Sequence, residues 1–217
     1  MKLYKLTGKG GCTKNNTHWD IGVTHEVTGV PELCTRTVLH AYTSPLLAAF
    51  MWPAHLSCSP EQFFVCEGEV VISDGTKVGC QKLTVIDTFE LPELTNCQRI
   101  AFGILSALQV YKDKTYQQWA SNWLTGKDRS ATAAADAANA AYAAADAAAD
   151  AADAAYAADA TASVAYAAAR AVYAADAVYA AAAAVAYAAY AAYAAARAVY
   201  PRQVINFEQL ALEALKY

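Results

Sequence analysis

One tract constrains the fold of this chain more than any other feature. Of the 70 residues in 131–200, 44 are alanine, nine are tyrosine and six are aspartate, and neither glycine nor proline occurs. Alanine has the highest helix propensity, so the tract is predicted to be helical. As a single helix it would be about 105 Å long, with few large apolar side chains to pack. Because small residues let helices approach closely, we expect an antiparallel bundle, with breaks near 159–163 and 180–184.

The side chains other than alanine recur every three or four positions at the start of the tract, which places them on one stripe of a helix. After Thr161, valine and tyrosine replace most of the aspartate, so 164–200 is expected to be more buried than 131–159. The tyrosine rings are expected chiefly to fill the gaps that alanine leaves. The alternative is an aromatic interface, for which the candidate residues are Tyr142, Tyr156, Tyr187, Tyr190 and Tyr193.

The composition before Leu91 is mixed, with glycine, proline and β-branched residues. The predicted fold class is therefore α+β, with a small N-terminal β-rich module in 1–91 followed by an alanine-rich antiparallel helical bundle in 92–217. Strands are expected over 3–6, 19–27, 63–72 and 77–88. The Asp-Gly pair in Ser73–Thr76 predicts a hairpin turn, and a short helix is expected to begin at Pro45 and to be stopped by Pro53.

Helix N-caps are expected at four polar residues, two of which begin the capping-box spacing of a hydroxyl residue and a glutamine. They are Thr95 (with Gln98), Thr115 (with Gln118), Ser130 and Asn206. Gly126 is expected to end the helix that carries Trp119 and Trp123. Pro201 is expected to stop the alanine tract.

Charge and targeting signals argue against two classes of partner. The formal net charge is −4, and the alanine tract alone has six aspartates against two arginines, so nucleic-acid binding is not expected. Residues 180–200 are long enough to span a bilayer. Alanine is only weakly apolar, however, and Arg197 lies within that stretch, so no membrane association is expected. Nothing near Met1 resembles a secretory signal, which predicts a cytoplasmic protein with reduced thiols.

All six cysteines lie in the first 97 residues, together with His18, His25, His40 and His55. Zinc is the alternative that this composition leaves open. No pair of these residues has the spacing of a known zinc motif, so we expect neither a metal nor a cofactor.

The densest group of reactive side chains is in the N-terminal module. A pocket built from histidine, tryptophan and arginine could hold an anionic or nucleotide-like ligand, and the candidate ligand-binding residues are Trp19, His25, Arg36, His40 and Tyr42. Gly8–Gly11 superficially resembles a phosphate-binding loop but lacks its strand–loop–helix context, so a turn is expected. No catalytic residue is predicted.

Several segments together resemble an uncharacterised family of tailed-phage and prophage proteins with alanine-rich C-termini. They are 17–25, 33–34, 39–42, 45–48, 77–80, 91–94, 109–111 and 119–130, of which Trp119–Ser130 is the most specific. The chain from Asn96 onward also resembles the helical domain assigned to immunity proteins of bacterial toxin systems. Neither resemblance supplies catalytic residues.

These features favour a non-enzymatic phage accessory protein, in the cytoplasm of the infected bacterial host, that binds and inhibits a host defence component. One alternative is a sponge that sequesters a small signalling nucleotide. Another is an enzyme that uses His25 or His40. A homo-oligomer is compatible with each of them.

Overall fold

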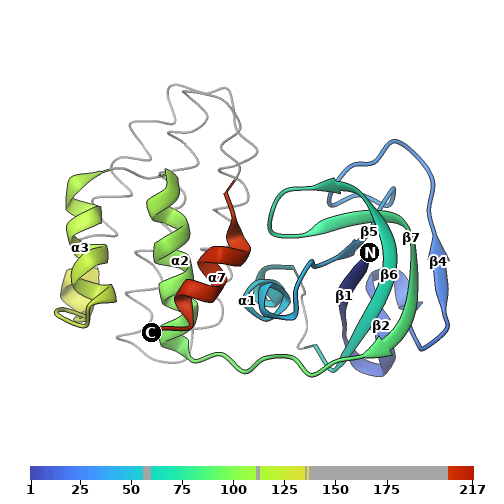
Figure 1. Cartoon of the computed structure of the whole chain (residues 1–217), viewed down its shortest axis with the longest axis horizontal. Coiled ribbons are helices and arrows are strands. Elements are labelled where there is room, and N and C mark those ends of the chain that lie inside the picture. Colours follow the sequence, from blue (N-terminus) through green and yellow to red (C-terminus); the bar gives the residue numbers. More distant parts are fainter. Residues whose placement is uncertain (56–59, 111–112, 135, 137–204) are drawn as a thin grey trace. The chain divides into compact units, whose positions relative to one another are not determined.

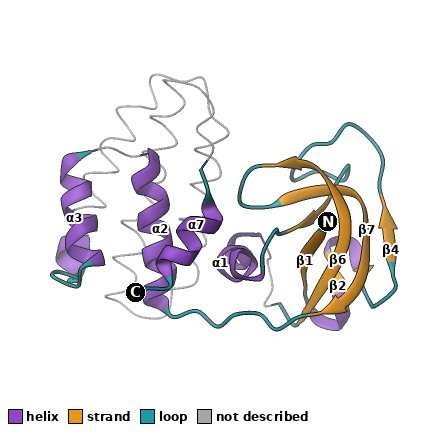
Figure 2. Ribbon diagram, in the orientation of Figure 1, coloured by secondary structure: helices purple, strands orange, loops and turns teal. Residues whose placement is uncertain are grey.

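The protein combines an antiparallel sheet with helices, and its fold class is α+β (Figures 1 and 2). The computed structural model describes residues 1–55, 60–110, 113–134, 136 and 205–217. Two compact units are present, Met1–Glu93 and Leu94–Tyr217, called unit 1 and unit 2 below. Nearly all of the alanine tract lies outside the described residues, and with it the predicted breaks, the stop at Pro201 and the five candidate interface tyrosines. The alanine-rich bundle predicted for 92–217 remains a prediction.

Unit 1 is built on one long hairpin of β6 (Gln62–Ser73) and β7 (Val78–Thr88). The turn between them is held by Asp74, whose Oδ1 accepts hydrogen bonds from the N–H groups of Thr76 (2.8 Å) and Lys77 (2.9 Å). Gly75 has a φ of 87°, a conformation that glycine adopts readily. The predicted Asp-Gly hairpin turn is thus confirmed.

Three more strands pair with the outer edges of this hairpin. Strand β1 (Lys2–Thr7) is antiparallel to β6, while β5 (Leu39–Ala41) and β4 (Thr24–Glu26) both pair with the second edge of β7. Beyond β5, Tyr42 exchanges two main-chain hydrogen bonds of 2.9 Å with Tyr4 of β1. Strands β1, β6, β7 and β5 therefore form a closed circuit. Register shifts between β6 and β7 allow these long strands to bend enough to close it.

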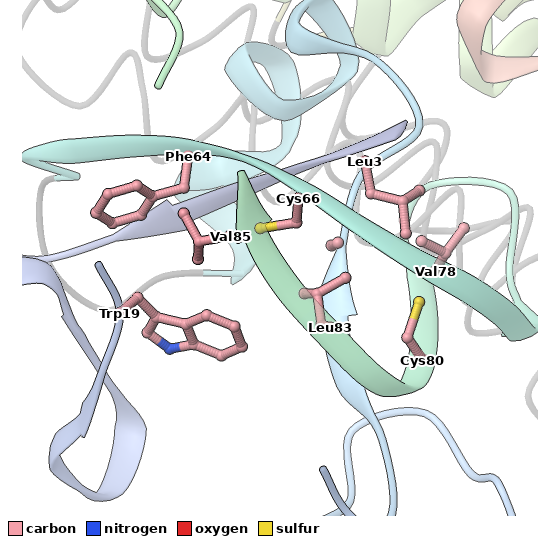
Figure 3. Packing of buried hydrophobic residues seen from close by; sticks show 9 residues of the cluster. Leu3, Trp19, Phe64, Cys66, Val78, Cys80, Leu83 and Val85 are labelled. Atoms are coloured by element: carbon pink, nitrogen blue, oxygen red, sulfur yellow. The ribbon is translucent and has the colours of Figure 1, made fainter. Parts of the chain in front are cut away.

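Apolar side chains fill the interior of this circuit. They are Leu3, Trp19, Ala41, Phe64, Cys66, Val78, Cys80, Leu83 and Val85, and Figure 3 shows the two thiols directed into the same core as Leu3 and Leu83. Alternation along β1 and β6 puts Leu6 and Val65 on the opposite face, where both are also buried. Helix α1 (Pro45–His55) contacts β1.

Two local predictions for unit 1 are wrong. Helix α1 continues through Pro53 to His55. The proline lies in the last turn, where losing its N–H removes only one intrahelical hydrogen bond. The predicted strand 19–27 is broken by a turn, in which Gly22 has a φ of 83° and the N–H of Val23 donates to the carbonyl of Asp20 (2.9 Å). Within 19–27 only β4 is extended, and β3 (Thr17–His18) ends just before this range.

A second, smaller hairpin precedes that turn. Strand β2 (Cys12–Thr13) pairs with β3, and short 3-10 turns η1 (Lys9–Gly11) and η2 (Lys14–Asn16) flank β2. The turn expected at Gly8–Gly11 is confirmed.

In unit 2, helix α2 (Asn96–Val110) packs antiparallel to α7 (Phe207–Ala214). The rings of Phe102 and Phe207 meet edge to face at 6.5 Å, and the Gln98 side-chain amide donates to the carbonyl of Leu215 (3.3 Å). The capping box at α2 is confirmed, because Gln98 N–H donates to Thr95 Oγ1 (3.1 Å) and Thr95 N–H donates to Gln98 Oε1 (2.9 Å). Asn206 caps α7 as expected, accepting from the N–H of Gln209 (3.0 Å).

Helix α3 (Lys114–Leu124) begins one residue before the predicted cap. The predicted box at Thr115 is wrong, because Asp113 accepts a hydrogen bond from the N–H of Tyr116 (2.9 Å) and is the N-cap. A carboxylate at this position also interacts favourably with the positive end of the helix dipole. The carboxylate two residues before Thr115 thus takes the place expected for the hydroxyl.

The segment after α3 forms a compact corner. Gly126 has a φ of 74°, and its N–H and that of Lys127 donate to the carbonyls of Trp123 (3.0 Å) and Asn122 (2.9 Å). This is the Schellman arrangement, and it confirms that Gly126 ends the helix. Arg129 folds back over Trp123, 4.5 Å from its ring, and donates to its carbonyl. Ser130 then caps the helical residues 131–134, accepting from the N–H of Ala133 (3.3 Å).

We expect Gly126→Ala to lower the stability of unit 2 by about 1 kcal/mol, because a side chain is strained at this positive φ. The site is otherwise open, with no atom within 4 Å of an added Cβ. The matched control is Gly126→Asn, since asparagine tolerates this conformation better and should lose less. Urea unfolding of the three proteins measures the difference. Equal losses for alanine and asparagine would contradict the backbone explanation.

Candidate functional site

A buried lysine lies at the centre of unit 1. Lys5 and Leu3 are two residues apart on β1 and therefore point to the same side, into the strand circuit. Only 8% of Lys5 is exposed. Its Nζ donates to the carbonyl of His40 on β5 (2.8 Å) and lies 4.5 Å from the centre of the Trp19 ring. The ammonium thus links β1 to β5 inside the core.

Burial shifts the pKa of Lys5 and of the two thiols beside it. Removal from water lowers the pKa of Lys5 to about 8, while the neighbouring Cys66 and Cys80 oppose the shift. Burial likewise raises the pKa of the Cys66 thiol to about 12 and raises that of Cys80. Near neutral pH the core therefore holds an ammonium close to two thiols that favour their neutral forms.

Trp19 is the main apolar contact of this lysine. The residue is 1% exposed, and its Nε1 donates to Thr13 Oγ1 (3.0 Å). The ring of His25 meets it edge on at 4.5 Å, and His25 Nε2 lies 2.7 Å from the carbonyl of His18. Two of the predicted ligand-binding residues are thus in contact, with Trp19 inside the core and His25 half-buried at its rim.

The His40 carbonyl accepts a hydrogen bond from Lys5, and the His40 ring accepts one from the preceding loop. The N–H of Cys34 donates to His40 Nε2 (3.0 Å), so Nε2 is unprotonated in this arrangement. Burial, followed by the positive charges of Lys5 and Lys77, lowers the pKa of His40 to about 4. The neutral ring therefore fixes Cys34, which has a φ of 65°.

The last two predicted ligand-binding residues, Tyr42 and Arg36, differ in burial. Tyr42 is buried, its main chain closes the strand circuit against Tyr4, and burial raises the pKa of its phenol. Arg36 is exposed on the loop before β5. The structure thus connects Trp19, His25 and His40 directly or through Lys5, whereas Arg36 faces solvent. Ligand binding by the five residues stays a prediction.

Sequence reasoning missed Lys5. The apolar positions Leu3 and Leu6 of β1 do not alternate, so the pattern did not show that Lys5 shares a face with Leu3. The pairing of Lys5 with His40 spans 35 residues and depends on the closure at Tyr42.

The exposed surface of unit 1 contains a long segment between β3 and β5, residues 20–38, here called the 20–38 segment. It includes one short strand, β4. Two large apolar side chains protrude from it, Ile21 at 60% and Val30 at 84% exposure. The charged residues Glu32 and Arg36 are also exposed.

Hydrogen bonds hold this segment along its length. The N–H of Gly22 donates to Val85 and that of Val27 to Gln81, at 2.9 and 2.8 Å. The Gln81 side-chain amide donates to the carbonyl of Gly29 (2.8 Å). Nearer β5, the Thr35 hydroxyl donates to the carbonyl of Glu32 (2.8 Å), and Cys34 is fixed by His40. The segment is exposed yet anchored to the hairpin.

We expect stability to fall as the pH drops from about 6.5 to 4, because the unfolded state takes up a proton on His40 before the folded state does. The contribution of His40 to the free energy of unfolding is complete above pH 6.5. It is lost as the pH falls to the folded-state pKa of His40, about 4. His40→Gln, which keeps an acceptor, should flatten this part of the profile. Urea unfolding from pH 7 to 4 measures it, and an unchanged slope in the variant would contradict the assignment.

Comparisons of the chain with protein-family models, with curated proteins and with solved structures find no match. Among the described residues, no group of three or more His, Cys, Asp or Glu side chains is arranged to hold a metal ion. No helix in the described part of the chain is both long enough and apolar enough to cross a membrane.

Proposed function

We propose that this protein is a non-enzymatic phage accessory protein that binds and inhibits a component of a bacterial defence system in the cytoplasm of the infected host. The observation that carries the proposal is the 20–38 segment, which exposes two branched apolar side chains while hydrogen bonds hold its backbone in place. The resemblance to phage proteins and to immunity-protein helices supports the choice of partner.

Ile21 and Val30 stand exposed on loops of a rigid scaffold, and such loops are common binding surfaces. The anchoring matters because a segment that is already ordered loses little conformational entropy when it binds. Glu32 and Arg36 lie between Val30 and β5 and supply charges of both signs. An apolar contact surrounded by charges is the usual composition of a protein–protein interface.

The reactive side chains in the interior of unit 1 are placed differently. Lys5, Tyr42, Cys66 and Cys80 are buried, and the His40 ring is engaged by Cys34. Their contacts stabilise the strand circuit. The arrangement favours recognition by the surface of the unit over chemistry in its interior.

The test is capture of a partner by the tagged chain from bacterial lysate, together with protection of an infecting phage in strains that carry single defence systems. Wild type should retain one stoichiometric partner and protect against the system to which that partner belongs. Val30→Asp should weaken capture at least about tenfold, the effect expected when an interface residue contributes more than about 1.4 kcal/mol.

The matched control is Leu212→Asp, a similar change at a residue of unit 2 that is 55% exposed. It should leave capture unchanged. Loss of capture in both variants, or protection without any partner, would refute the role of the 20–38 segment. Mass spectrometry of small molecules released from the denatured protein tests the nucleotide-sponge alternative in the same sample.

A further inference from the structure

Strand β4 is an edge of the unit 1 sheet, and within the described part of the chain one of its sides is unpaired. It stands last in the strand order β1–β6–β7–β4, and Figure 1 shows it on the outer side of β7. The carbonyl of Val23 and the N–H of Val27 are both bonded to β7, at 2.9 and 2.8 Å. Main-chain groups alternate in direction along an antiparallel strand, so those of His25 also point toward β7 and those of Thr24 and Glu26 point away from it.

Thr24 and Glu26 thus present their N–H donors and carbonyl acceptors on the free side of β4. In the chain segments that the structure describes, no hydrogen bond engages these groups. Both residues are exposed, so the edge is open to solvent. An edge strand with free donors and acceptors is a template on which a strand of another chain can pair.

We propose that the β4 strands of two copies of this chain pair antiparallel about a two-fold axis at His25. In this register Thr24 of each copy lies opposite Glu26 of the other, and the two residues exchange both of their outward main-chain hydrogen bonds. Every free donor and acceptor on both strands then has a partner. The edge is therefore complementary to itself, which favours a second copy as its occupant.

The other two-fold registers are less favourable. An axis at Glu26 would set its carboxylate against that of the second copy, and like charges directly opposite each other destabilise a sheet. An axis at Thr24 would set Glu26 against Gly22, whose N–H already donates within its own copy (2.9 Å). With the axis at His25, the two His25 residues face each other, and each ring keeps its contact with Trp19 of its own copy, with ring centres 4.5 Å apart.

The side chains on the exposed face of β4 are compatible with this register. Glu26 forms an ion pair with Lys82 of β7, and the hydroxyl groups of Thr24 and Thr84 are hydrogen-bonded (2.8 Å). The ion pair of one copy thus lies beside the neutral threonine pair of the other. Val30 lies outside the paired residues, so this interface is distinct from the position at which the proposed binding of a host protein is tested.

The experiment is sedimentation equilibrium of the full chain over a range of concentrations. Because only a short strand pairs, wild type is expected to be a dimer that dissociates on dilution. Glu26→Pro removes an outward N–H but no bond to β7, and proline is tolerated at such edge positions. It should weaken dimerisation at least about tenfold, because symmetry removes the bond twice. Glu26→Gln is the matched control, since it keeps the N–H and should dimerise as wild type does.

Hydrogen exchange of wild type tests the register without a variant, and near-ultraviolet circular dichroism checks that each variant folds. The Thr24 and Glu26 amides should exchange more slowly at concentrations at which the chain is dimeric. The Val27 amide, already bonded to β7, is the internal control and should change little. A monomer at every concentration, or unchanged exchange of Thr24 and Glu26 in the dimer, would overturn the proposal. So would a folded Glu26→Pro that dimerises as wild type does, or an equal loss in Glu26→Gln.

Discussion

The difference in stability between wild type and Lys5→Met is expected to change by about 3 kcal/mol between pH 8 and pH 10.5, in favour of wild type as the pH rises. The pKa of Lys5 is lowered to about 8 in the folded protein, against 10.5 as the ordinary value. Between these values the unfolded chain binds more protons than the folded one. The contribution of Lys5 to the free energy of unfolding is therefore complete only above pH 10.5, and it is lost as the pH falls through about 8.

Wild type must be compared with the variant because other groups make the stability fall as the pH rises. The raised pKa values of Cys66 and Tyr42 lower stability in alkali, since these groups ionise more readily in the unfolded chain. Both remain in Lys5→Met, so subtraction leaves the contribution of Lys5. Methionine has a similar length and carries no charge, although it leaves the His40 carbonyl without its donor.

Urea unfolding of both proteins at several pH values between 7 and 10.5 provides the measurement. Lys2→Met is the control, because Lys2 lies on the same strand but is exposed. If the stability difference between wild type and Lys5→Met stays constant with pH, the Lys5 ammonium is hydrated in solution. The same slope for Lys2→Met would show that the effect is not specific to the buried site.

Features set by neighbouring residues could be predicted from the sequence. The Asp74–Gly75 turn, the Thr95–Gln98 box and the stop at Gly126 each depend on a few adjacent residues. The cap of α3 was misplaced at Thr115, because the capping-box spacing of Thr115 and Gln118 drew the prediction away from Asp113, which caps the helix. The break at Gly22 was missed because the apolar and polar residues around it still alternate.

The candidate sites depend on contacts between distant segments. Lys5 meets the His40 carbonyl and the Trp19 ring only because Tyr42 pairs with Tyr4 and closes the circuit. Likewise, Cys12 and His18 are six residues apart in the sequence. That spacing does not show that the two residues meet, which they do because β2 pairs with β3. Composition placed the histidines and cysteines in the N-terminal part of the sequence. The register of the strands determined which of them meet.

Replacing Trp19 by alanine is expected to destabilise unit 1 by about 3–5 kcal/mol, the range for loss of a buried aromatic side chain. Trp19 is 1% exposed, and its removal leaves a cavity beside the Lys5 ammonium. It also removes the donor to Thr13 Oγ1. Thr13→Val is the control that removes this acceptor, together with the donation of the Thr13 hydroxyl to the Thr17 carbonyl (3.4 Å), and it should lose about 1–3 kcal/mol because Nε1 then stays buried without its acceptor.

A double-mutant cycle isolates the contact between the ring and the ammonium. If Lys5 Nζ is stabilised by the ring at 4.5 Å, Lys5→Met and Trp19→Ala should be coupled by about 0.5–2 kcal/mol at pH 7. The coupling should fall at pH 10, because a neutral amine interacts weakly with an aromatic face. Urea unfolding of the four proteins measures it, with Trp19→Leu in place of alanine if the latter unfolds unit 1. Coupling of the same size at both pH values would mean that the two side chains interact through packing alone.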